Sequence, residues 1–229
     1  MVQAATIHTI DDPGHDLWIE CPTCKQTWHG RFQLEMARGH SRRYSDRPED
    51  DSERVFAESH LATVLRQHGK LTEALPMGER VLATCRQFYG PDDPFTIASQ
   101  QDLAAIHAAM GEYDKALPLE QEALAFHRRE YGDEDRSTLM TISSVATTCT
   151  EMGNFEAARA LCEERLATQR RVRADDGVGL HVATHGLACL YCETGEMTRA
   201  VPLFNESLEL SRRVFGSAHL TTLEVAGNL

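Results

Sequence analysis

The stretch Met110–Gly132, MGEYDKALPLEQEALAFHRREYG, has the apolar spacing of one amphipathic helix but contains Pro118. A proline inside a helix lacks the backbone N–H and clashes with the carbonyl four residues earlier, at a cost of about 3 kcal/mol. The proline nevertheless recurs, because Pro76 lies 42 residues before Pro118 and Pro202 lies 84 residues after it. The helical pattern extends on both sides of each proline. We therefore predict that these helices continue through their prolines with a local bend.

The same 42-residue shift aligns other residue types along the chain. The aligned sets are Gly69, Gly111, Gly153 and Gly195; Ala74, Ala116, Ala158 and Ala200; and Leu82, Leu124, Leu166 and Leu208. A fixed period of this size is typical of stacked repeats, and helical spacing on both sides of the glycine predicts a helical hairpin in each repeat. We predict an all-α fold, an α-solenoid of about four hairpins, behind a short irregular N-terminal segment over 1–45 that contains one helix, in RFQLEMARGHSRRY. The array spans 46–229, with units 51–92, 93–134, 135–176 and 177–218 and a partial fifth, 219–229.

Small residues are predicted to line the seam of each hairpin. An alanine on the first helix is followed 12 residues later by an alanine on the second, as in Ala62 with Ala74 and Ala188 with Ala200. Two small residues at this spacing let the paired helices approach closely. This pattern resembles the tetratricopeptide repeat. The 42-residue unit, the proline in KALPLEQEAL and the connector YGPDDPFT are similar to the repeats of kinesin light chains.

The resemblance implies the fold and a protein or peptide partner, but not the cargo of kinesin. In the light chains an asparagine before the leucine of the first helix helps to hold bound peptide. At that place this chain has His60, Asp102, Ser144 and Gly186.

A partner groove is implied on the concave face of the first helices, as the resemblance places it. The groove positions lie two residues before and two residues after the leucine-type position, and most of them are small. They are Ser59, Thr63, Gln101, Ala105, Ser143, Thr147, His185 and Cys189. We expect their hydroxyl groups and one amide to serve the backbone of a partner segment.

Charge and cysteine content limit the class of partner. The net charge of −12 argues against nucleic acid or an anionic membrane, and no apolar run is long enough to cross a bilayer. Seven cysteines, an odd number behind an N-terminus without a secretion signal, fit reduced thiols in the cytoplasm.

The N-terminal segment carries the one pattern typical of a metal site. In LWIECPTCKQTWHG, Cys21 and Cys24 have the spacing of a zinc knuckle, and WIECPTC resembles the end of a RING-type zinc-binding domain. Three interpretations stay open: a zinc site completed by histidines such as His15 or His29, a remnant of a larger zinc domain, and a plain surface loop. No cofactor other than zinc is predicted.

Two further patterns concern charge and metal ligands. An arginine recurs near the end of each second helix, at Arg86, Arg128, Arg170 and Arg212, where it complements the helix dipole and can pair with acids such as Glu79 or Glu163. An alternative role for these arginines is the recognition of acidic or phosphorylated segments. His181, His185, Cys189 and Cys192 share one face of a helix. They extend over about 16 Å, too far for one ion, so we interpret them as groove-lining residues.

The sequence therefore predicts a non-catalytic protein-interaction scaffold that binds a partner segment in its groove. It contains no P-loop, GxGxxG, GxSxG or HExxH motif. Two alternatives are the substrate-binding part of a RING-like, zinc-dependent ubiquitin ligase and a truncated gene product.

Overall fold

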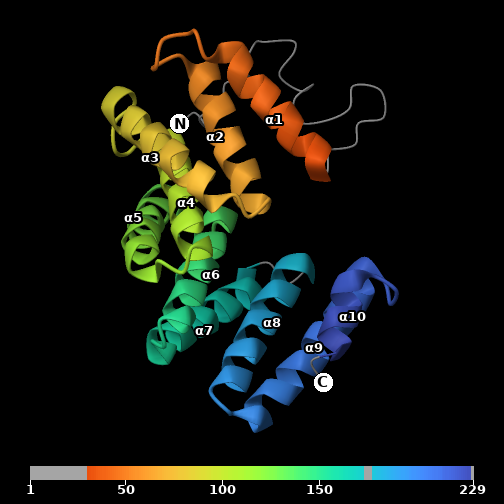
Figure 1. Cartoon of the computed structure of the whole chain (residues 1–229). Helices are drawn as coiled ribbons and strands as arrows, with labels where there is room; N and C mark the ends of the chain where they lie inside the picture. Colours follow the sequence, from red (N-terminus) through yellow and green to blue (C-terminus); the bar gives the residue numbers. More distant parts are fainter. Residues whose placement is uncertain (1–29, 173–176, 228–229) are drawn as a thin grey trace. The chain divides into compact units, whose positions relative to one another are not determined.

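The computed structural model describes residues 30–172 and 177–227, and within these ranges all regular structure is α-helical (Figure 1). The all-α prediction is confirmed. The helices are α1 (Gly30–Tyr44), α2 (Ser52–Gln67), α3 (Leu71–Phe88), α4 (Pro94–Ala109), α5 (Tyr113–Tyr131), α6 (Arg136–Glu151), α7 (Phe155–Val172), α8 (Gly177–Glu193), α9 (Met197–Phe215) and α10 (Leu220–Gly227).

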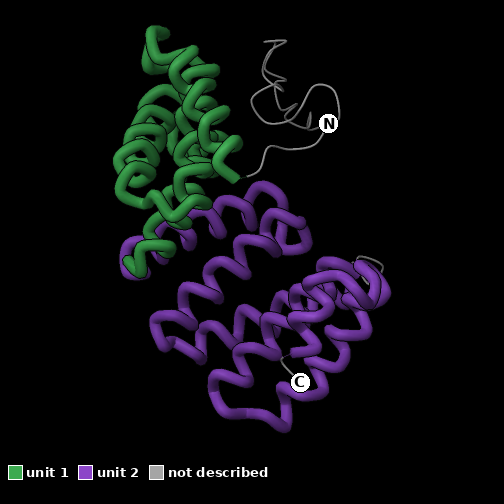
Figure 2. Tube along the Cα trace, turned by 45° about the vertical axis from the view of Figure 1, so that its right-hand side comes forward, with its two compact units in different colours: residues 1–112 green, residues 113–229 purple. Residues whose placement is uncertain are grey.

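The chain divides into two compact units, residues 1–112 and 113–229 (Figure 2). Within each unit, helices that follow one another in sequence pack together, as α2 does with α3 and α8 with α9. First helices of successive hairpins also touch, α2 with α4 in unit 1 and α6 with α8 in unit 2. These contacts are those of stacked helical hairpins.

The alanine seams lie in the cores of the units. Ala62 and Ala74 belong to the core of unit 1, together with Leu61, Leu65 and Ile106. In unit 2, Ala188 and Ala200 have no exposed surface and pack in a cluster that also holds Leu166, Tyr191 and Phe204. A larger side chain at these alanines would push the paired helices apart.

The turns follow the local chemistry of the sequence. The hairpin glycines have positive φ values of 68° at Gly69, 76° at Gly111, 74° at Gly153 and 78° at Gly195, a conformation that other residues adopt at a cost. Aspartates cap three first helices. The Asp51 side chain accepts a hydrogen bond from the backbone N–H of Arg54. In the same way the Asp93 side chain accepts one from the N–H of Phe95, and the Asp135 side chain accepts one from the N–H of Ser137.

The helices continue through the recurrent prolines, as predicted. Pro76 lies within α3, Pro118 within α5 and Pro202 within α9. Each proline removes the hydrogen bond that its N–H would donate to the carbonyl four residues earlier. Packing of the amphipathic helix against its neighbours offsets this loss.

No helix among the described residues is both long and apolar enough to cross a bilayer.

Candidate functional site

A cavity of about 310 Å³ lies on unit 2 between α6 and α8, with α7 contributing to its wall. We call it the α6–α8 cavity. Ser143 and Thr147 of α6 and His185 and Cys189 of α8 all line it. The structure thus brings together the four predicted groove residues that belong to unit 2. At Gly186, which also lines the cavity, an added Cβ would meet no atom within 4 Å.

The hydroxyl groups on α6 are already used as donors within the helix. Ser143 donates to the carbonyl of Leu139, at an oxygen–oxygen distance of 3.3 Å, and Thr147 donates to the carbonyl of Ser143 at 3.0 Å. Thr150, which also lines the cavity, donates to the carbonyl of Ala146 at 2.9 Å. Each hydroxyl therefore keeps only its acceptor capacity for a ligand. This wall of the cavity accepts hydrogen bonds from a partner and donates none.

The α8 wall is formed by a histidine and a thiol one turn apart. The Cys189 Sγ atom lies 3.6 Å from Nδ1 of His185. Burial, and next the neighbouring His181, lower the pKa of His185, so its ring is neutral at pH 7. Burial raises the pKa of the Cys189 thiol. Among the described residues no group of three or more His, Cys, Asp or Glu side chains is placed to hold a metal ion.

The deepest charged group of the cavity is Arg165 of α7, which sequence reasoning missed. Its exposed fraction is 9%, and its Nε atom is buried without a hydrogen-bond partner in the part of the chain that the structure describes. Burial lowers the pKa of this guanidinium, and the Cys162 thiol raises it by a smaller amount. Arginine nevertheless stays protonated at neutral pH. The cavity therefore holds one desolvated positive charge.

The repeat register contains a signal that could have found this residue. Shifts of 42 residues place Arg165 in line with Val81, Ala123 and Ser207, all of them buried and uncharged. A charge at a position that is buried in the other repeats departs from the pattern of the fold.

Two carboxylates stand at the rim of the cavity. Glu151 at the end of α6 and Glu193 at the end of α8 both line it and are both exposed. The Tyr113 hydroxyl donates to Glu151 at 3.1 Å. The cavity thus combines a buried cation with an acidic entrance.

In unit 1 two of the predicted groove residues form hydrogen bonds with a carboxylate. Ser59 donates to Oδ2 of Asp102 at 3.1 Å, and Thr63 also donates to this carboxylate. Burial raises the pKa of Asp102 although these two hydrogen bonds act against the shift. Gln101 and Ala105 lie half-buried on α4. Ser59 and Thr63 are thus engaged with Asp102, which stands where kinesin light chains have their asparagine.

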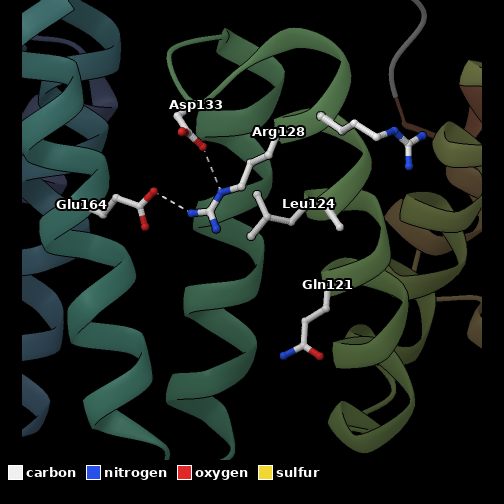
Figure 3. Close-up of a pocket in the computed structure, with 7 residues that line it drawn as sticks. Gln121, Leu124, Arg128, Asp133 and Glu164 are labelled. Atoms are coloured by element: carbon white, nitrogen blue, oxygen red, sulfur yellow. Dashed lines mark hydrogen bonds and ion pairs between the residues drawn. The ribbon is translucent and has the colours of Figure 1, made fainter.

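A shallower pocket lies along α5 and includes the recurrent arginine of that helix (Figure 3). Arg128 Nε lies 3.2 Å from Asp133, and its Nη2 donates to Glu164 of α7 at 2.6 Å. The next repeat has the equivalent pair, in which Arg170 donates to Glu206 of α9 at 2.6 Å. The predicted partner Glu163 instead accepts from the Tyr191 hydroxyl. These arginines pair neighbouring second helices.

The predicted metal ligands Cys21 and Cys24, with His15 and His29, lie outside the described residues. The zinc site and the RING-like segment therefore remain predictions from sequence.

A family model described as "Tetratricopeptide repeat" matches residues 53–129, 105–171 and 135–211. No curated protein sequence matches the chain. Among solved structures, a Podosopora anserina putative kinesin light chain with nearly identical repeats is similar at a TM-score of 0.69 and 21% identity, over 80% of this chain and 87% of that one. BtubC from P. vanneervenii is similar at a TM-score of 0.69 and 17% identity, over 82% of this chain and 75% of that one. A Rap protein complexed with competence and sporulation factor is similar at a TM-score of 0.65 and 13% identity, over 86% of this chain and 58% of that one.

Proposed function

Because the chain belongs to the tetratricopeptide repeat family, we propose that it is a protein-interaction module without catalysis of its own, which binds a segment of a protein partner in the α6–α8 cavity. Repeats of this family typically mediate interactions between proteins. The observation that carries the proposal is the cavity itself, since it is lined by the four groove positions of unit 2 that the family resemblance implies.

The chemistry of the cavity suits a peptide segment. Three hydroxyl oxygens on α6 accept hydrogen bonds, which the backbone N–H groups of an extended segment would supply. The volume of about 310 Å³ lies at the lower end of the range of about 300–1,000 Å³ for ligand pockets. We therefore expect it to take side chains from a short segment and not a whole helix.

The partner is a protein and not nucleic acid, because the chain has a net charge of −12. The Rap protein, which has a similar fold, was solved in complex with competence and sporulation factor, and this supports a binding role for the fold. A cytoplasmic location remains a prediction from the odd number of cysteines.

Display of random peptides on phage, with the whole chain immobilised, tests the proposal without a known partner. The affinity of the strongest selected peptide is then measured by fluorescence polarisation for the wild-type chain and for Gly186→Phe. This substitution places a ring in the open space above Gly186. We expect binding to weaken at least tenfold, about 1.4 kcal/mol, with little change in Tm.

The matched control is Ala167→Phe, which adds the same ring at an exposed position of α7 that does not line the cavity. It should bind the peptide as the wild type does. If the selected peptides bind Gly186→Phe as tightly as the wild type, the cavity is not the binding site and the proposal is wrong.

A further inference from the structure

We propose that the partner segment inserts an acidic side chain into the α6–α8 cavity, where its carboxylate pairs with Arg165, while a neighbouring basic residue lies at the rim beside Glu151 and Glu193. This inference rests on the proposed function and adds the chemistry of the segment that is bound.

Arg165 is a residue that is costly for the fold to bury. A buried cation without a counter-charge loses its hydration and gains no ion pair in return, so such residues are rare inside proteins. Arg165 is more than nine-tenths buried, and its Nε atom has no hydrogen-bond partner among the described residues. Equivalent positions in the other repeats hold valine, alanine and serine. The fold does not require a cation at this position, which points to a ligand.

The carboxylates on α7 and at the rim of the cavity do not supply a counter-charge for Arg165. Glu163 accepts from the Tyr191 hydroxyl at 2.8 Å, and Glu164 accepts from Arg128. Glu151 accepts from the Tyr113 hydroxyl, and Glu193 is exposed at the rim. None of these acids forms an ion pair with Arg165 in the described structure. A carboxylate from outside would supply the missing counter-charge.

The hydrogen-bonding groups of the cavity leave Arg165 as the group that would bind an anion. Ser143, Thr147 and Thr150 offer only acceptor oxygens, and the His185 ring is neutral. Among the described residues that line the cavity, Arg165 is thus the only cationic donor. A guanidinium is well matched to a carboxylate, because its planar N–H groups can bind both oxygens at once.

The acidic rim of the cavity favours a basic residue next to the inserted acidic side chain of the partner segment. Exposed charges such as Glu151 and Glu193 are screened by salt, whereas the buried charge of Arg165 is screened much less. A carboxylate can therefore enter past the rim, and a lysine or arginine beside it in the segment would meet Glu151 and Glu193. The expected signature is an acidic residue with a basic neighbour.

A first test needs no ligand. Arg165→Met keeps the aliphatic stem and removes the buried charge, so Tm should stay the same or rise. Arg171→Met is the control, because Arg171 lies on the same helix but is exposed and paired with Glu134. If Arg165→Met lowers Tm well below that of Arg171→Met, the guanidinium stabilises the fold itself, and the proposal is contradicted.

The second test uses the phage-selected peptides. Peptides selected on the wild-type chain should share an Asp or Glu with Lys or Arg close by. Changing that acid to its amide should weaken binding to the wild type at least tenfold. The same change should have little effect on binding to Arg165→Met, because the two substitutions remove one interaction. Arg165→Lys, which keeps the charge without the fork of N–H groups, should bind with intermediate affinity.

The outcomes separate this inference from the function on which it rests. Peptides that lose affinity for Gly186→Phe but are unaffected by the amide change would show a binding groove without the proposed carboxylate, and would overturn this inference alone. If no selected peptide loses affinity for Gly186→Phe, the proposed function fails and this inference fails with it.

Discussion

Gly186→Ala is expected to stabilise the protein, although it adds an atom to the wall of its cavity. Glycine within a helix is about 1 kcal/mol less favourable than alanine, because it has more backbone freedom to lose on folding. Position 186 lies within α8, and an added Cβ meets no atom within 4 Å. No clash opposes the gain, and the methyl group gains little burial in an open cavity. The net effect is about 1 kcal/mol, or a rise in Tm of about 2–4 °C for a chain of this length.

Gly177→Ala, on the same helix, provides the contrast. An added Cβ there would lie 2.6 Å from Cγ2 of Val214, well inside van der Waals contact. Valine is branched at Cβ and has little rotamer freedom, so the neighbouring helix has to shift. Overpacking of this kind costs about 1–3 kcal/mol, and Tm should fall.

Thermal melts followed by circular dichroism at 222 nm measure both variants against the wild type. The reasoning is refuted if Gly186→Ala lowers Tm, since side chains would then fill the space above α8 where the cavity is described.

Three further predictions concern the core and its titratable groups. Ala200→Glu should cost several kcal/mol, because Ala200 has no exposed surface, whereas Arg171→Ala should cost under about 1 kcal/mol; equal losses of Tm would contradict the buried seam. Burial raises the pKa of Glu120, so its negative form lowers stability once the pH exceeds the ordinary range of a glutamate. Glu120→Gln should therefore raise stability by about 1–3 kcal/mol at pH 7, and the gain should vanish below about pH 4, as denaturant melts at both pH values would show. Burial raises the pKa of Cys162 to about 11, so iodoacetamide at pH 8 should label the exposed Cys192 well before Cys162; equal labelling by mass spectrometry would disprove this.

The helical architecture could be predicted from sequence because each part depends on local chemistry repeated at a fixed period. The glycine turns and aspartate caps are set by residues only a few positions apart. Each proline conflicts with the helical spacing around it. Its recurrence at equivalent positions in three repeats resolved this conflict, because three equivalent breaks in helices would be improbable. Four of the eight predicted groove residues meet at one cavity for the same reason: the register fixes which helix face each occupies.

Which side chains pair between neighbouring helices was less predictable. Glu163 and Glu164 are adjacent in sequence but about 100° apart around α7, so one accepts from Tyr191 and the other from Arg128. Sequence spacing alone does not say which side of the helix the neighbouring repeat covers. Similarly, the sequence did not show that the hydroxyls of Ser143 and Thr147 donate to carbonyls of their own helix, so that only their acceptor capacity is left for a partner.

Arg165 could not be predicted from the features that the repeats share. Its importance lies in the opposite property, a charge where the equivalent residues are uncharged and buried. Such exceptions are visible in the sequence once the register is known. Their burial and the missing hydrogen-bond partner of Nε require three-dimensional packing.

Hydrogen–deuterium exchange of the whole chain, with and without the strongest phage-selected peptide, shows whether a segment binds in the α6–α8 cavity. Peptide bound there slows exchange in residues 143–150 of α6 and 182–193 of α8, the segments that line the cavity. The same peptide should leave the exchange of Gly186→Phe unchanged at equal concentration. Protection confined to α5, α9 or α10, with α6 and α8 exchanging as in the free protein, would contradict the account.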